Sequence, residues 1–109
     1  MSNKSLVVIN ASIEIDSFIR DEYAKEQVAI AKIRKLLPNT TAICDQITIF
    51  SWDEPSEGYP TYMAYADYGV KIKIPSVFED DVARYMKSIY PELNNNIVND
   101  IWVDDSYEE

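Results

Sequence analysis

The strongest constraint on the fold of this chain is a two-residue alternation that runs from Tyr62 to Ile74. Even-numbered positions of the stretch are apolar or aromatic: Tyr62, Ala64, Ala66, Tyr68, Val70, Ile72 and Ile74. Odd-numbered positions carry Met63, Tyr65, Asp67, Gly69, Lys71 and Lys73. Successive side chains of a β-strand point to opposite faces of a sheet, so this stretch predicts a strand with one face on a core and the other toward water or a partner.

Gly69 leaves two interpretations of the stretch open. Asp67, Tyr68 and Gly69 are able to form a short turn with the glycine in the left-handed region, which would divide the stretch into a hairpin. Alternatively, the alternation runs through Gly69 as one long strand, with or without a bulge. The apolar even-numbered set keeps its phase across the glycine, and this favours the single strand.

Three further segments have strand patterns. The run from Leu6 to Ile9 is continuously apolar and extends to Ile13, which is typical of a strand covered on both faces. Residues 41–52 alternate, with Ile43, Ile47 and Ile49 on one side and Cys44, Gln46, Thr48, Phe50 and Trp52 on the other. Residues 97–103 predict a last strand, with Ile97, Ile101 and Val103 on one face and Val98 and Trp102 on the other.

A first helix is expected over residues 17–37. Asp16 or Ser17 would accept a backbone N–H as the N-cap, and Pro38 closes the segment. At helical spacing the apolar stripe consists of Ile19, Tyr23, Ile30, Ile33 and Leu37, flanked by Phe18, Ala29 and Leu36. This stripe is expected to pack on the sheet.

A second helix is expected to begin at Ser76, which caps it, with Glu79 as the capping-box partner. Pro91 stops this helix because proline cannot continue the backbone hydrogen bonds. Its apolar stripe consists of Phe78, Val82, Tyr85, Met86 and Ile89.

The succession of elements is strand, helix, strand, strand, helix, strand. It predicts an α+β fold: a single compact domain over residues 1–103, followed by an acidic C-terminal tail over residues 104–109. The β-α-β-β-α-β order further predicts an antiparallel sheet with two helices on one face, as in ferredoxin-like domains, where the first and third strands are central.

Charge is distributed unevenly along the chain, whose formal net charge is −9. Residues 1–37 contain six basic and five acidic side chains, whereas residues 38–109 contain four basic and fourteen acidic ones. This field disfavours direct binding to nucleic acid and adsorption to anionic membranes. A protein partner with a basic surface would be attracted.

The composition also excludes most enzyme classes. The chain has no histidine, which removes the commonest general base and metal ligand, and its single cysteine, Cys44, cannot build a zinc site. Only Gly58 and Gly69 are available for phosphate-binding loops. We therefore predict a non-enzymatic protein without a cofactor, a metal or catalytic residues. The absence of a signal-like segment, a membrane-length apolar run or paired cysteines favours a soluble protein of the cytoplasm.

Carboxylates supply the remaining chemical alternative. Glu22 and Glu26 are one helical turn apart, and acidic clusters occur in the loop at Asp53, Glu54 and Glu57 and at Glu79–Asp81. These residues would suit a divalent-metal or carboxylate-dependent activity on a small ligand. Acidic runs usually mark a solvated face, and we interpret Glu22 and Glu26 in that way.

The leading hypothesis is an acidic domain that binds another protein through the loop after residue 52 and the outward face of the predicted long strand. Tyrosine and tryptophan are enriched at protein interfaces, and long loops are often functional. A specific version is an inhibitor of the phage or mobile-element type, whose carboxylates imitate nucleic-acid charge. A structural subunit that forms homo-oligomers through its sheet is a further alternative. The candidate partner-binding residues are Trp52, Asp53, Glu54, Glu57, Tyr59, Tyr62, Met63, Tyr65, Asp104 and Asp105.

Overall fold

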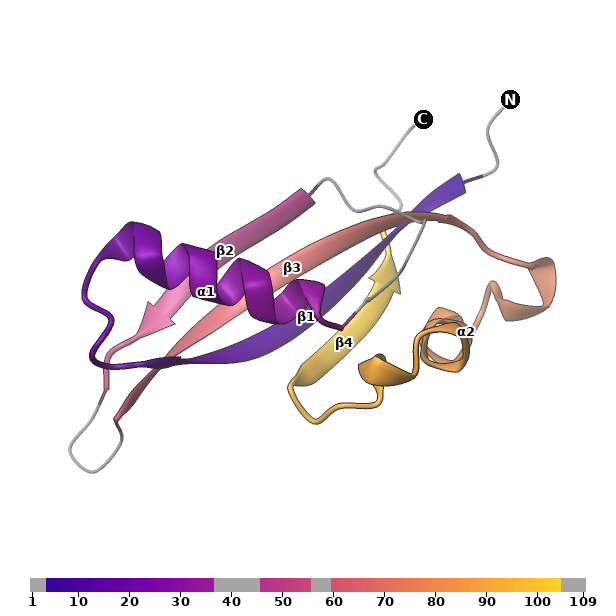
Figure 1. Ribbon diagram of the computed structural model, residues 1–109. Helices are drawn as coiled ribbons and strands as arrows, with labels where there is room; N and C mark the ends of the chain where they lie inside the picture. Colours follow the sequence, from indigo (N-terminus) through magenta and orange to yellow (C-terminus); the bar gives the residue numbers. More distant parts are fainter. Residues whose placement is uncertain (1–3, 37–45, 56–59, 105–109) are drawn as a thin grey trace.

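The structure of the protein is a computed structural model, which describes residues 4–36, 46–55 and 60–104. Four strands form one antiparallel sheet in the order β2-β3-β1-β4 (Figure 1). The strands are β1 (Lys4–Asp16), β2 (Gln46–Asp53), β3 (Thr61–Lys73) and β4 (Val98–Val103). The helices are α1 (Glu22–Arg34) and α2 (Val82–Ile89), and the 3-10 turns η1 (Ser76–Phe78) and η2 (Pro91–Leu93) flank α2. The predicted α+β class, with an antiparallel four-stranded sheet and two helices in a single compact domain, is confirmed.

The two central strands, β1 and β3, are paired along their whole length. Their register runs without a shift from the pair Lys4 and Lys73 to the pair Asp16 and Thr61. Gly69 lies inside β3, opposite Val8. The prediction of one continuous strand through the glycine is therefore confirmed.

One continuous hydrophobic core joins a single face of the sheet to both helices. Alternate residues of β1 and β3 supply the sheet side of this core: Val7, Ile9, Ala11, Ile13, Ile15, Ala64, Ala66, Tyr68 and Val70. Ala29 and Ile33 of α1 and Val82 and Met86 of α2 supply the helix side.

The first helix starts later than predicted. The β1 strand continues to Asp16, so the helix is capped by Asp21, whose carboxylate accepts the backbone N–H of Ala24 at 2.9 Å. The predicted stripe is wrong at Phe18 and Tyr23, whose side chains are 85% and 68% exposed. Residues 17–21 connect β1 to α1 and do not form the expected first helical turn, and the buried line of α1 consists of Lys25, Ala29 and Ile33.

The second helix also starts later than predicted. Ser76 makes no side-chain cap and begins the 3-10 turn η1. The N-cap of α2 is Asp81, whose carboxylate accepts the backbone N–H of Arg84 at 3.2 Å. Pro91 follows α2 and begins η2, so the predicted end of this helix is close to the observed one.

Register shifts change the side-chain pattern of both edge strands. The β2–β3 register shifts between Ile49 and Ser51, and as a result Trp52 packs against the core together with Ile49, whereas Phe50 is exposed. The expected grouping of Trp52 with Phe50 is therefore wrong. A second shift, between Asn10 and Ala11 in the pairing with β4, similarly lets Val98 pack against the core, on the side opposite to Trp102.

The caps observed in the structure make a prediction about helix stability. Asp21→Ala should lower the free energy of unfolding by about 1 kcal/mol, because it removes the acceptor for the Ala24 N–H. Ser17→Ala should change it by no more than a few tenths of a kcal/mol, since Ser17 donates to the Pro60 carbonyl only through its backbone. Urea unfolding measures both values. A larger loss in Ser17→Ala than in Asp21→Ala would contradict the observed start of α1.

Candidate binding face of the sheet

The sheet face opposite the helices carries side chains that the core does not use, and we call it the open face. On this face lie Leu6, Val8, Asn10, Ser12 and Glu14 of β1, Thr48, Phe50 and Asp53 of β2, Met63, Tyr65, Asp67, Gly69, Lys71 and Lys73 of β3, and Asn99, Trp102 and Asp104 at β4. Antiparallel sheets commonly have one face on the core and the other toward solvent. In the described part of the chain both helices pack on the opposite face (Figure 1).

An aromatic pair and a carboxylate form one end of the open face. The rings of Phe50 and Tyr65 are stacked, with their centroids 6.5 Å apart, and Phe50 is 55% exposed. The Tyr65 hydroxyl donates to Oδ2 of Asp53 at 2.8 Å. This hydrogen bond, followed by the negative charge of Asp53 and by loss of hydration, raises the pKa of the Tyr65 phenol above its ordinary value.

Hydrogen bonds between side chains cross the middle of the open face. Asn10 Nδ2 donates to Oδ1 of Asp67 at 2.7 Å. Asn99 Nδ2 donates both to Oδ1 of Asn10 at 2.9 Å and to Oγ of Ser12 at 2.7 Å. This network connects β4, β1 and β3, and it holds the Asp67 carboxylate in a defined orientation.

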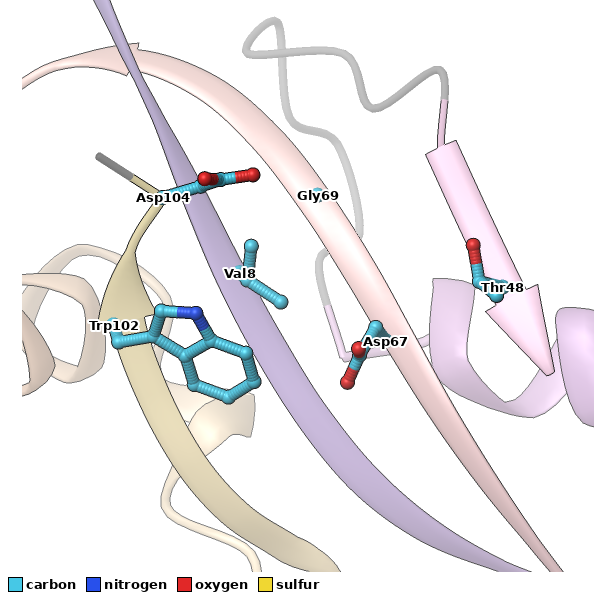
Figure 2. Close-up of a pocket in the computed structure, with 6 residues that line it drawn as sticks. All are labelled: Val8, Thr48, Asp67, Gly69, Trp102 and Asp104. Carbon is cyan, nitrogen blue, oxygen red and sulfur yellow. The ribbon is translucent and has the colours of Figure 1, made fainter. Parts of the chain in front are cut away.

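A hollow of about 250 Å³ lies beside this network, and we call it the Gly69 hollow. Its lining residues are Val8, Thr48, Asp67, Gly69, Trp102 and Asp104 (Figure 2). Trp102 and Gly69 are both register partners of Val8, so these three residues form one row across three strands. The space exists because Gly69 contributes no side chain to that row. Figure 2 shows Val8 at its centre, with the Trp102 indole on one side and the Asp67 carboxylate on the other.

The structure divides the predicted partner-binding residues between two faces. Asp53, Met63 and Tyr65 lie together on the open face. Asp104 lies on the same face at the Gly69 hollow, toward the other end of the sheet. Glu54 is exposed directly after β2. Trp52 and Tyr62 pack on the helix face instead. The remaining three predicted residues, Glu57, Tyr59 and Asp105, lie outside the described residues, as does Cys44.

Trp52 and Tyr62 contact a lysine that the sequence did not single out. The Nζ of Lys25 lies 4.1 Å from the centroid of the Tyr62 ring and 5.9 Å from that of the Trp52 ring, and it contacts Oε1 of Glu22 at 3.1 Å. Lys25 is only 7% exposed. Its spacing of four residues from Ala29 was the available signal, because residues i and i+4 share a helix face.

The carboxylate alternatives receive little structural support. Glu22 and Glu26 are both exposed, which confirms that they are solvated. Within residues 4–36, 46–55 and 60–104, no three acidic or cysteine side chains are placed to hold a metal ion together. In the acidic cluster at residues 79–81, the Asp81 carboxylate caps α2 by accepting the backbone N–H of Arg84.

The Gly69 hollow was not predicted from the sequence either. Its formation requires Val8, Gly69 and Trp102 to be neighbours across three strands, which no local pattern reveals. The glycine in the middle of a strand was the one available signal, because such a position often marks a close approach by a ligand or another backbone.

Comparison of the chain with protein-family models, with curated proteins and with solved structures found no match. Across the residues that the structure describes, neither helix has the length and apolar character needed to cross a membrane.

The contact between Asp53 and Tyr65 makes a prediction about pH dependence. The pKa of Tyr65 should lie above the ordinary tyrosine value of about 10 and fall toward it in Asp53→Asn. Because the folded-state pKa is raised, the stability that this contact contributes is present below about pH 10 and is lost as the pH rises through the folded-state value. The pKa is measured by NMR titration of the Tyr65 ring carbon that bears the hydroxyl. The Tyr65→Phe variant assigns this signal, because it lacks the hydroxyl. Asp67→Asn is the control, and an unchanged Tyr65 pKa in Asp53→Asn would contradict the assignment.

The position of Lys25 makes a prediction about stability. Lys25→Met keeps most of the apolar stem but removes the ammonium group from the two aromatic rings, so it should lower the free energy of unfolding by about 1 kcal/mol. Lys35→Met is the matched control, because that side chain is exposed, and it should have an effect of a few tenths of a kcal/mol. Urea unfolding tests both variants. A Lys25→Met protein as stable as the parent would show that the ring contacts do not stabilise the fold.

Proposed function

We propose that this protein is a non-enzymatic, acidic protein-binding domain of the cytoplasm, and that its open face docks on a basic surface of a protein partner. One observation carries this proposal: the face that the core leaves unused combines aromatic rings that are exposed or partly exposed with carboxylates held in place by hydrogen bonds. The rings belong to Phe50, Tyr65 and Trp102, and the carboxylates to Asp53 and Asp67.

The aromatic residues support a protein partner. Phenylalanine, tyrosine and tryptophan are enriched in the buried centres of protein interfaces, where they bury a large area for few rotatable bonds. Phe50 and Tyr65 are already stacked, and Tyr65 is held by Asp53. Less side-chain entropy is then lost on binding than if these residues were free to rotate.

The charge supports a basic partner. A net charge of −9 on 109 residues attracts a cationic surface and speeds its encounter with the chain, whereas it repels phosphate backbones. We propose the specific version in which the carboxylates imitate nucleic-acid charge and the domain inhibits a nucleic-acid-binding protein, as phage and mobile-element inhibitors do. Two basic side chains, Lys71 and Lys73, also lie on the open face. Binding of a basic partner would therefore depend on where each charged side chain lies on this face, as well as on the net charge of the chain.

The strand order supports the finer assignment of a ferredoxin-like arrangement. Strands β1 and β3 are central, and the helices pack on one face. In ferredoxin-like RNA-binding domains the open face of the sheet is the surface that binds. In this chain the same face would serve a protein.

Affinity capture with the full chain as bait tests the proposed function. We expect capture of a basic nucleic-acid-binding protein that is weakened by salt and competed by DNA. The double variant Phe50→Ser with Tyr65→Ser should reduce capture by about tenfold or more. Phe18→Ser with Tyr23→Ser is the matched control, because it removes the same two exposed residue types outside the open face.

Two outcomes would contradict the proposal. Equal capture by the open-face variant and the parent would exclude the open face as the binding surface. Capture of a neutral partner that is insensitive to salt would exclude nucleic-acid mimicry.

A further inference from the structure

We propose that the Gly69 hollow receives a single arginine side chain of the partner, with the guanidinium group stacked on the Trp102 indole and hydrogen-bonded to the Asp67 carboxylate. This inference rests on the proposed function and names the residue type that the open face would recognise. Three features of the hollow support it: its size, the chemistry of its two sides and the fixed position of Asp67.

The size of the hollow suits one side chain. Pockets for cofactors and drug-sized molecules usually measure about 300–1,000 Å³. The Gly69 hollow, at about 250 Å³, lies below that range and opens directly on the sheet surface. A β-carbon at position 69 would project into this space, because odd-numbered residues of β3 point to the open face.

The two sides of the hollow match the two properties of a guanidinium group. Trp102 is 37% exposed, so its indole can be covered by a flat cation, and tryptophan is the strongest aromatic partner for cations. Asp67 lies on the opposite side of Val8 and supplies a carboxylate (Figure 2). Arginine is planar, stacks on aromatic rings and donates paired hydrogen bonds to carboxylates. Lysine carries a compact, strongly hydrated charge and lacks the planar fork.

Asp67 is held in place before any ligand arrives. Its Oδ1 accepts from Asn10, and Asn10 accepts in turn from Asn99. An ionised carboxylate has two oxygens and about four acceptor positions, so the bond from Asn10 leaves capacity for a guanidinium group. Asp104 and Lys71, which lie on the same part of the open face, each have an interaction within the chain. We assign the recognition to Asp67 because it lies across Val8 from the Trp102 indole and its orientation is fixed by Asn10.

Charge favours an arginine over the other flat group that would stack on Trp102, a nucleobase. A nucleobase enters with its phosphate, and the net charge of −9 repels phosphate. An arginine of a basic protein is attracted by the same field.

The test is an NMR titration of the isotope-labelled full chain with a blocked Gly-Arg-Gly peptide, and with Gly-Lys-Gly for comparison. The Trp102 indole N–H signal should shift in a saturable manner, with the arginine peptide binding about fivefold more tightly than the lysine peptide. The Trp52 indole is an internal control, because that side chain packs on the opposite face of the sheet.

Three variants sharpen this test. Asp67→Asn removes the charge but keeps an oxygen that can accept from Asn10, and it should weaken arginine-peptide binding about fivefold or more. Gly69→Ala places a methyl group in the hollow beside Val8 and should have a similar effect. Asp53→Asn removes a carboxylate from the same face outside the hollow, and it should weaken binding by less than about twofold. If Gly69→Ala disturbs folding, the comparison of Asp67→Asn with Asp53→Asn still shows whether the arginine peptide binds in the hollow.

The proposal would be overturned by an unmoved Trp102 signal, by equal binding of the two peptides, or by equal effects of Asp53→Asn and Asp67→Asn. The capture experiment distinguishes failure of the arginine site from failure of the proposed function. Capture of the basic partner that is unchanged by Asp67→Asn would exclude the arginine site and leave the open-face function intact. A specific arginine-peptide site without any captured basic partner would support the hollow and contradict the proposed function.

Discussion

The pairing of β1 with β3 is the constraint on which the rest of this structure depends. Thirteen consecutive residues of each strand are paired without a register shift, so the parity of a residue determines its face along the whole centre of the sheet. The edge strands then attach on either side, β2 to β3 and β4 to β1. The helices cover the face where both central strands are apolar.

This division leaves the protein with two faces of different composition. The helix face holds the core, and its buried β1 residues, such as Ile9 and Ile13, stabilise the fold by leaving water. The open face carries exposed rings and a connected set of amide and carboxylate groups. Phe50 and Trp102 are exposed there, and aromatic side chains are enriched at protein interfaces.

Two departures from regular geometry change which side chains lie on each face. The shift after Ile49 turns Trp52 toward the helices and leaves Phe50 free to stack on Tyr65. Trp52 then provides, with Tyr62, the aromatic surroundings of Lys25. In this way one irregularity in an edge strand contributes both to the packing of α1 and to the aromatic end of the open face.

The sequence by itself determined the α+β class, the order of the elements, the unbroken strand through Gly69 and the solvated position of Glu22 and Glu26. These features follow from local periodicity and from the cost of burying charge, both of which can be read along the chain. Only the tertiary structure decided where the helices begin, which face Trp52 and Val98 occupy, that Lys25 is buried, and that Gly69 opens a hollow beside Trp102. The physical reason is that register shifts, buried cations and surface hollows arise from contacts between distant segments, and the periodicity of one segment does not specify its neighbours.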